Sequence, residues 1–233
     1  MRVRVMTYNI QGHAAERQQD HLIKVAETVA AATPDVVALQ EVYCRKTGDQ
    51  VALVAQLAGL KLVFGKSCEI NGGDYGNAIL TRGAIESSRV HPLPGAGEPR
   101  SLLEACIAID GKRFTFFGTH LAAWGRLLRA ARLEQIAMLG DITARAGSPH
   151  LLAGDFNVTP RAEELRALLA HGHLRYCGDL REPTFPSTRQ RLDYIFCDAA
   201  WEVVETRVIR RGPSDHWPLV ADLVMSSPPE THP

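Results

Sequence analysis

The chain has 233 residues, of which 45% are hydrophobic and 22% are charged, and its 26 basic and 26 acidic side chains give a formal net charge of zero. This composition is typical of a globular protein with a single α/β domain. The neutral balance argues against a protein held to nucleic acid or to an anionic membrane mainly by bulk positive charge. No apolar stretch approaches the roughly 20 residues that a membrane-spanning helix needs.

Short apolar or alternating segments, of a length that suits β-strands, recur along the chain. They cover residues 3–8, 36–39, 60–64, 78–81, 102–109, 113–118, 151–153, 192–197, 202–208 and 219–224. Helical periodicity lies between some of them, at residues 20–32, 49–58, 126–145 and 161–170. Asp110 and Gly111, between two apolar segments, predict a two-residue hairpin. This order favours two stacked sheets with helices outside.

No repeat or flexible linker divides the chain, so we expect one domain over residues 1–225 and a flexible tail over residues 226–233. The five cysteines are scattered and form no C-x-x-C pair, which favours reduced thiols in an intracellular compartment. No signal region opens the chain. We therefore expect a cytoplasmic protein.

The most informative pattern is the polar residue that ends each buried strand. The predicted strands end on Asn9, Glu41, His120 and the segment Asp155-Phe156-Asn157. Asp193 opens a late strand, and Asp215-His216 precede the last one. In α/β proteins such strand ends meet at one edge of the sheet, where sites are commonly built. These side chains are thus expected to lie together.

Each of these residues also has a purely structural interpretation. Asn9 and Asp215 could cap turns, Asp155 and Asn157 could form an Asx-turn, Glu41 could begin a solvated loop, and His120 could be a structural histidine. Coincidence in all of them together is a poorer explanation than a shared site.

The residue types suit phosphoester hydrolysis. Carboxylate and amide oxygens are hard donors that bind Mg²⁺ or Mn²⁺, and they occur here at Asn9, Glu41, Asp155, Asn157 and Asp215. A divalent metal stabilises charge on phosphoryl oxygens and activates water. Histidine can take or give the proton near pH 7. Asp193 is the candidate that orients His216.

These motifs resemble the endonuclease/exonuclease/phosphatase superfamily, the deoxyribonuclease I and exonuclease III-like metal-dependent hydrolases. Seven segments match in family order: Thr7-Tyr8-Asn9-Ile10, Ala38-Leu39-Gln40-Glu41-Val42, Gly76-Asn77-Ala78-Ile79-Leu80-Thr81-Arg82, Gly118-Thr119-His120-Leu121, Gly154-Asp155-Phe156-Asn157, Leu192-Asp193-Tyr194-Ile195 and Ser214-Asp215-His216-Trp217-Pro218. The resemblance covers nearly the whole domain. It implies an α/β fold of four layers, an α-β-β-α sandwich with two stacked mixed sheets.

The resemblance also implies roles for the site residues. Glu41 would be the main Mg²⁺ ligand, with Asn9 and Asp215 close to the metal. Asp155 and Asn157 would align water and stabilise the transition state, and His120 would bind the scissile phosphate. The family leaves the general base open between His216, paired with Asp193, and Asp155. Gln11 stands where some members carry an aspartate, which speaks against a second permanent metal there.

Two further features are candidates for substrate binding. Arg100 resembles a phosphate-contacting arginine of some relatives, and Trp124 could stack on a base. Arg126, Arg129 and Arg132, at i, i+3 and i+6, could meet a phosphate backbone or acidic head groups. The alternatives are a surface arginine at Arg100, a buried indole at Trp124 and a solvated helix face.

The sequence therefore predicts a monomeric Mg²⁺-dependent phosphoesterase, with Mn²⁺ as a substitute and no protein partner, that hydrolyses phosphodiesters by metal-assisted attack of water. Nucleic acid leads only narrowly as the substrate, because avid binding to it normally uses many Lys and Arg contacts that a neutral chain lacks. The alternatives are a phosphatase or phosphodiesterase acting on a lipid or small phosphorylated metabolite, and a binding module without turnover.

Overall fold

The structure is a computed structural model that describes residues 1–12, 18–45, 50–123 and 125–226. In this part of the chain the first sheet has six strands in the order β11-β12-β1-β2-β4-β3. Their bounds are β1 Arg2–Asn9, β2 Val36–Arg45, β3 Lys61–Ile70, β4 Gly73–Thr81, β11 Trp201–Val208 and β12 Leu219–Met225. β1 and β2 run parallel, and every other neighbouring pair is antiparallel.

The second sheet, within the same described ranges, repeats this plan in the order β5-β6-β7-β8-β10-β9. Its strands are β5 Ala84–Leu93, β6 Arg100–Ile109, β7 Lys112–His120, β8 His150–Asp155, β9 Arg175–Tyr176 and β10 Asp193–Cys197. Here β7 and β8 are the parallel pair. The predicted mixed sheets are confirmed, and each has its parallel pair near the centre.

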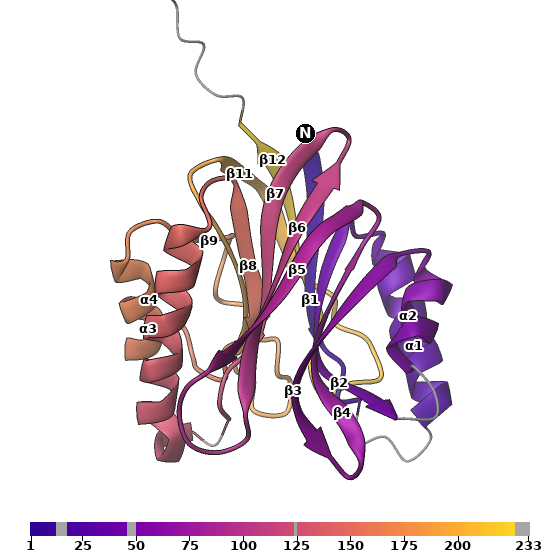
Figure 1. Ribbon diagram of the computed structural model, residues 1–233, viewed down its shortest axis with the longest axis horizontal. Helices are drawn as coiled ribbons and strands as arrows, with labels where there is room; N and C mark the ends of the chain where they lie inside the picture. Colours follow the sequence, from indigo (N-terminus) through magenta and orange to yellow (C-terminus); the bar gives the residue numbers. More distant parts are fainter. Residues whose placement is uncertain (13–17, 46–49, 124, 227–233) are drawn as a thin grey trace, which may run out of the picture.

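Helices cover the outer face of each sheet. The helices are α1 (Gln18–Ala32), α2 (Gln50–Ala58), the 3-10 helix η1 (Gly125–Leu128), α3 (Arg129–Arg145) and α4 (Glu163–Ala170). Figure 1 shows α1 and α2 outside the first sheet and α3 and α4 outside the second, with the two sheets face to face between them. This is the expected four-layer α-β-β-α sandwich.

Three apolar clusters hold the layers together. The cluster between the sheets contains Val5, Ala38, Phe116, Ala153 and Ile195, one from each of five central strands, all essentially without exposed surface. Separate clusters fill the space between each sheet and its helices. The central strands are therefore buried on both faces, which fits their nearly continuous apolar sequences.

The predicted hairpin is present, and two strands, β5 and the two-residue β9, were not foreseen. Asp110 and Gly111 both have positive φ, 49° and 74°, and join β6 to β7 as a tight two-residue turn requires. No apolar pattern marks β5, because this edge strand is largely exposed and carries polar side chains on both faces. The predicted helix over residues 126–145 is divided into η1 and α3.

Some expectations concern residues outside the described ranges. Trp124 lies outside them, and so does the predicted tail except for Ser226. Among the described residues, no helix is both long enough and apolar enough to cross a membrane. Cys68, Cys106, Cys177 and Cys197 are free thiols.

Candidate active site

The candidate site lies where strand ends of the two sheets meet. Asn9 ends β1 in one sheet, and Asp155 ends β8 in the other. The side-chain amide of Asn9 joins them, since its Nδ2 donates to Asp155 Oδ2 at 3.1 Å and to Glu41 Oε1 at 3.1 Å. In the second sheet His120 and Asp193 both pair in register with Asp155. The sheet topology thus gathers three of the predicted residues, Asn9, His120 and Asp193, around one carboxylate, and Glu41 is joined to them through Asn9.

An irregularity in β2 places Glu41. The pairing of β2 with β4 shifts register between Leu39 and Val42, and Glu41 within this bulge has a φ of 56°. Gly12 donates its backbone N–H to the carbonyl of Glu41 at 3.0 Å. A Cβ on Gly12 would lie 2.6 Å from that carbonyl oxygen, so only glycine allows the close approach. Bulges of this kind commonly redirect a side chain at a site.

The two oxygens of Asp155 have different tasks. Oδ1 accepts the backbone N–H of Asn157 at 2.9 Å, and Asn157 has a φ of 54°. The Asx-turn interpretation of this segment is therefore correct. Oδ2 instead faces Asn9, with His120 Nε2 and His216 Nε2 each 3.6 Å away. The structural and the chemical interpretations of Asp155 are compatible because they use different atoms.

His216 is held by Asp193 and by its own loop. Its Nδ1 donates to Asp193 Oδ2 at 2.8 Å, and its ring lies 4.8 Å from that of Phe185, centroid to centroid. Thr184 Oγ1 accepts the backbone N–H of Asp193, and Arg191 donates to the Asp193 carbonyl. Asp193 Oδ1 is buried and has no hydrogen-bond partner among the described residues. The Asp193 charge therefore acts mainly on the imidazole.

His120 is oriented from behind by Arg100. The Arg100 side chain is 7% exposed, donates from Nη1 to His120 Nδ1 at 2.9 Å and pairs with Glu98 at 2.8 Å. Because a guanidinium only donates, His120 Nδ1 accepts in this contact. The other ring nitrogen, Nε2, faces Asp155 Oδ2 at 3.6 Å and lies 3.0 Å from Asn157 Nδ2, the amide nitrogen that also donates to the Leu121 carbonyl. Arg100 thus lies behind the histidine, where it holds the ring in place.

Burial and neighbouring charges shift the titration of the central residues. Burial, reinforced by the Asp193 carboxylate, raises the pKa of Asp155 to about 7, although His216 and Asn9 act in the opposite direction. Burial alone would lower the pKa of His216. The carboxylates of Asp193 and Asp155 outweigh it and raise the pKa of His216 to about 10. The imidazole of His216 is accordingly protonated at neutral pH, and the neighbouring carboxyl group of Asp155 titrates near neutral pH.

Asp215 lies at the rim of the site. It is exposed, and its Oδ2 accepts from Gln11 Nε2 at 3.3 Å. Its neighbour Ser214 ties the loop to β1 by donating to the Asn9 carbonyl at 2.7 Å. Gln11, which the sequence singled out as a departure from an aspartate, therefore bridges the first strand and this loop.

One residue near the site escaped the sequence analysis. Tyr75, 2% exposed on β4, has its pKa raised by burial and by the nearby charge of Glu41, while a hydrogen bond with Arg100 acts to lower it. It therefore interacts with Glu41 of the first sheet and with Arg100 of the second. Its signal is weak in the sequence, because a tyrosine within an apolar strand is usually a core residue.

The donor set fits a hard divalent cation. Glu41 and Asp155 offer two carboxylates on either side of the Asn9 amide, and these oxygens are the ligands that Mg²⁺ and Mn²⁺ prefer. A second group, Asp155, Asp193 and His216, has ligand-type atoms within 4.8 Å of one another. There His216 Nδ1 already bonds to Asp193, so the Glu41 side is the better place for a metal.

Comparisons with known proteins agree with this fold and site. The model of the Endonuclease/Exonuclease/phosphatase family matches residues 6–216. A structure described as endonuclease/exonuclease/phosphatase from Beutenbergia cavernae is 26% identical, with a TM-score of 0.80 over 96% of this chain and 72% of that one. No curated protein matches the sequence.

Two more distant structures share the fold. The human Nocturnin catalytic domain with bound sulfate is 23% identical, with a TM-score of 0.79 over 97% of this chain and 95% of that one. Danio rerio TDP2 complexed with single-strand DNA product is 19% identical, with a TM-score of 0.80 over 96% and 99%. Since the family model spans most of the sequence, the chain belongs to the endonuclease/exonuclease/phosphatase family.

Proposed function

We propose that this protein is a Mg²⁺-dependent phosphodiesterase whose catalytic centre is built around Asp155, within a domain of residues 1–225. Members of its family hydrolyse phosphoester bonds. The observation that carries the proposal is the position of Asp155 Oδ2, which faces the amide of Asn9 and the Nε2 atoms of His120 and His216. A phosphoryl group placed there would meet an acid, a base and hydrogen-bond donors together.

The metal ligands proposed are Glu41 and Asn9, with Asp215 at the rim. A divalent cation supplies neutralisation of the charge on the phosphoryl oxygens when it is bound. Glu41 provides the carboxylate that attracts it, and the Asn9 amide can contribute its oxygen once the side chain turns. Gln11 carries no charge, which supports a single permanent metal at this end. Mn²⁺, which prefers the same ligands, is expected to substitute.

Asp155 is our choice for the general base and His216 for the acid. A water molecule attacks phosphorus, its proton passes to Asp155 Oδ2, and the bond from phosphorus to the leaving oxygen breaks. His216 Nε2–H donates to that leaving oxygen or to a phosphoryl oxygen. The raised pKa of His216 supports this order, because an imidazolium cannot accept the water proton. Asp193 is then the group that stabilises the imidazolium.

His120 and Asn157 would bind the phosphate from the other side. The Arg100 contact at Nδ1 leaves Nε2 of His120, beside the Asn157 amide, to face the phosphoryl oxygens. We assign Arg100 to positioning this ring, since its side chain is buried and its Nη1 donates to His120 Nδ1 at 2.9 Å. Its predicted contact with substrate stays a prediction.

The proposed substrate is a phosphodiester, with nucleic acid or a nucleotide as the first class to test. TDP2, which shares the fold, was crystallised with single-strand DNA product, which makes nucleic acid a reasonable starting point. A lipid or small-metabolite phosphoester is the second candidate. The cytoplasmic location and the monomeric state belong to the same proposal.

The test is hydrolysis of bis(p-nitrophenyl) phosphate and of p-nitrophenyl phosphate in Mg²⁺, in Mn²⁺ and in EDTA. The proposal predicts faster hydrolysis of the diester, abolished by EDTA. Preference for the monoester would change the assignment to a phosphatase. Absence of hydrolysis of both esters, in Mg²⁺ and in Mn²⁺, would refute metal-dependent phosphoester hydrolysis.

Glu41→Gln tests the metal ligand. It should raise the Mg²⁺ concentration for half-maximal activity by at least about tenfold. Glu134→Gln is the matched control, because Glu134 is exposed on α3 and lies outside the site. Equal Mg²⁺ requirements for the two variants would exclude Glu41 as a ligand.

A further inference from the structure

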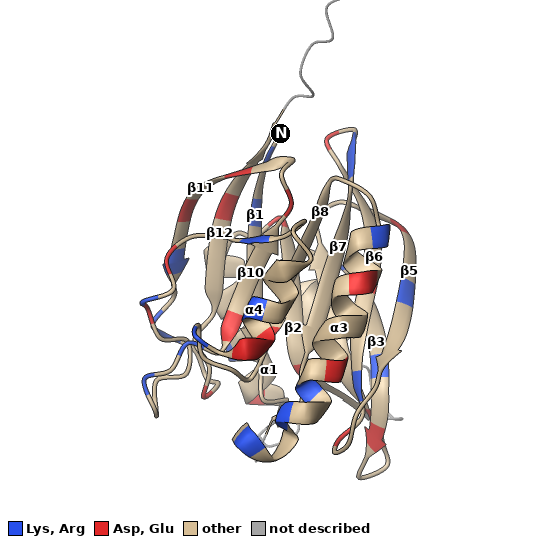
Figure 2. Cartoon of the chain, turned by 90° about the vertical axis from the view of Figure 1, so that its left-hand side faces the viewer, with Lys and Arg blue, Asp and Glu red and all other residues tan. Residues whose placement is uncertain are grey.

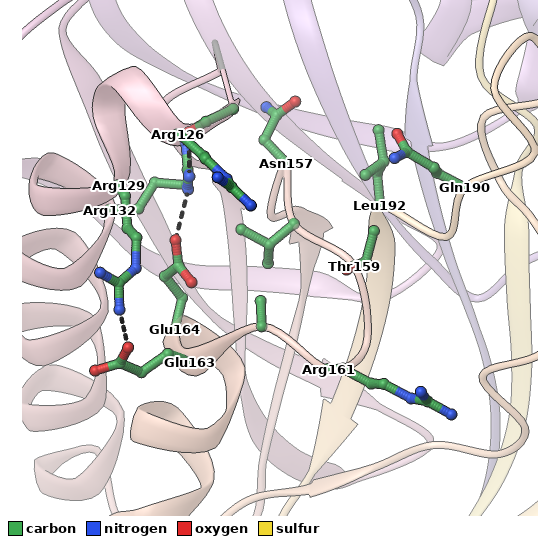
Figure 3. A pocket seen from close by; sticks show the side chains of 13 residues that line it. Arg126, Arg129, Arg132, Asn157, Thr159, Arg161, Glu163, Glu164, Gln190 and Leu192 are labelled. Atoms are coloured by element: carbon green, nitrogen blue, oxygen red, sulfur yellow. Dashed lines mark hydrogen bonds and ion pairs between the residues drawn. The ribbon is translucent and has the colours of Figure 1, made fainter.

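A pocket beside the proposed catalytic centre is lined, apart from Asn157, by residues that have no role in the proposed chemistry. It begins at Asn157 and has a volume of about 740 Å³. Val158, Ala162 and Leu192 contribute apolar surface, and Thr159 and Gln190 contribute polar side chains. Figure 3 shows Thr159, Gln190 and Leu192 around the opening, with Asn157 at one side. The volume lies in the range of pockets that hold ligands of nucleotide size.

Positive charge exceeds negative charge in the lining of this pocket. Four arginines line it, against two glutamates. The lining therefore has two more positive than negative side chains, whereas the whole chain has a net charge of zero. Figure 2 shows basic residues at the start of α3, in the layer of helices that covers the second sheet.

The three arginines of the predicted stripe differ in their burial and in their carboxylate partners. Arg132 is buried, pairs with Glu164 at 3.1 Å and donates to the carbonyls of the segment before α3. Arg129 pairs with Glu163 at the surface. Arg126 lies in η1, before the helix, and is exposed. Only the last of the three has no carboxylate partner among the described residues.

Arg126 extends into the pocket. Figure 3 shows its guanidinium in the opening between Asn157 and Glu164, whereas Arg129 and Arg132 turn toward their glutamates. Arg161 lies at the other end of the pocket, exposed and likewise without a carboxylate partner in the described ranges. Two uncompensated cations thus lie along a path that starts at the proposed catalytic asparagine.

We propose that this pocket binds the nucleotide next to the scissile bond, with Arg126 on its second phosphate and Arg161 on the phosphate that follows. The inference rests on the proposed function and adds a substrate class to it, a nucleotide chain with more than one phosphate. A guanidinium is suited to this task because it donates two parallel hydrogen bonds to a phosphate. The glutamates do not repel the phosphate strongly, because each is already paired.

The first test compares substrates that differ in one phosphate. The substrates are p-nitrophenyl esters of thymidine monophosphate, in both the 3′ and the 5′ series, with and without a phosphate on the other hydroxyl. In one of the series the second phosphate should raise kcat/KM roughly tenfold, the effect of one charge-assisted contact. Arg126→Ala should remove this gain, and Arg161→Ala should change it little, because its contact lies further along.

Arg145→Ala is the matched control. Arg145 lies at the end of α3, the helix that follows η1, is exposed and is outside the pocket. It removes the same charge, so any effect shared with Arg126→Ala would be long-range electrostatics. Arg145→Ala should hydrolyse bis(p-nitrophenyl) phosphate, which carries no second phosphate, at the wild-type rate. A wild-type enzyme that gains nothing from the second phosphate in either series would overturn the proposal.

A binding measurement separates this inference from the proposed function. Fluorescence anisotropy of a labelled thymidine trinucleotide in EDTA needs no turnover. Arg126→Glu combined with Arg161→Glu should weaken binding by at least about tenfold and lower the slope of log Kd against log salt by about 0.7 for each arginine–phosphate pair that is removed. Weaker binding without turnover on any ester would refute the phosphodiesterase and keep the subsite. Unchanged binding would refute the subsite whatever the activity.

Discussion

Replacing Arg132 by methionine should destabilise the protein strongly, because it leaves a buried carboxylate without its partner. The side chains of Arg132 and Glu164 are each only 4% exposed. Arg132 also donates to the carbonyls of Ala122, Ala123 and Gly125. It therefore joins α4 to the segment that follows His120.

The magnitude follows from the burial of the pair. Removing one partner of a buried ion pair typically costs about 3–5 kcal/mol, because the remaining charge is uncompensated. A domain of this size is stable by about 5–15 kcal/mol, so Arg132→Met should lower the denaturation midpoint clearly while the protein still folds. In the double variant Arg132→Met with Glu164→Leu no charge is buried, and at least about 2 kcal/mol of stability should return.

Urea denaturation of the wild type, both single variants and the double variant measures these differences. The free energies of unfolding form a double-mutant cycle, which isolates the coupling between the two side chains. A destabilisation below about 1 kcal/mol for Arg132→Met would contradict the assignment of a buried, coupled pair. So would a double variant whose destabilisation equals the sum of the two single effects.

Three other parts of the structure give predictions of their own. Gly12→Ala should lower the free energy of unfolding by about 1–3 kcal/mol and weaken Mg²⁺ binding, since the new Cβ would press on the Glu41 carbonyl. Thermal denaturation and metal titration measure the two effects. Gly118→Ala, whose Cβ would make ordinary contacts, should lower the stability less. Burial alone would lower the pKa of His150, but hydrogen bonds and the Asp198 charge raise it above 6.5. The protonated His150 therefore stabilises the folded state, fully below pH 6.5, and this contribution is lost as the pH rises through the folded pKa. Asp198→Asn should therefore cost more stability near pH 5.5 than near pH 8.5, and a cost that does not change with pH would disprove the link. Arg100→Met should lower kcat on the diester about tenfold or more with the fold intact. Arg100→Lys, which keeps a donor, should recover part of the lost kcat. Equal activity of the wild type and the two variants would rule out a positioning role.

The strand-end rule explains why much of the site could be predicted. Asn9, His120 and Asp155 are each the last residue of a strand buried on both faces, so the change from apolar to polar residues marks the end of that strand. The parallel pairs then bring these ends to one edge. Local sequence carries this information, because each residue needs only its own strand to be recognised.

The residues that the sequence placed poorly depend on long-range packing. The spacing of Arg126, Arg129 and Arg132 would give one exposed face only in a continuous helix. The helix begins at Arg129, and the partner that buries Arg132 comes from α4, over thirty residues later. Arg100 and Tyr75 likewise gain their surroundings from other strands. β5 was missed because an exposed edge strand needs no apolar face.

The pairing of His216 with Asp193 during turnover is the sharpest test of the proposed catalytic centre. Hydrolysis of bis(p-nitrophenyl) phosphate should be measured in Mg²⁺ for His216→Ala, Asp193→Asn and the double variant, after circular dichroism shows that all are folded. We expect His216→Ala to lower kcat by about 10²–10⁴ and the double variant to be no slower, because the two groups act as a unit. Effects that simply multiply, or full activity without His216, would contradict a catalytic centre built on this pair.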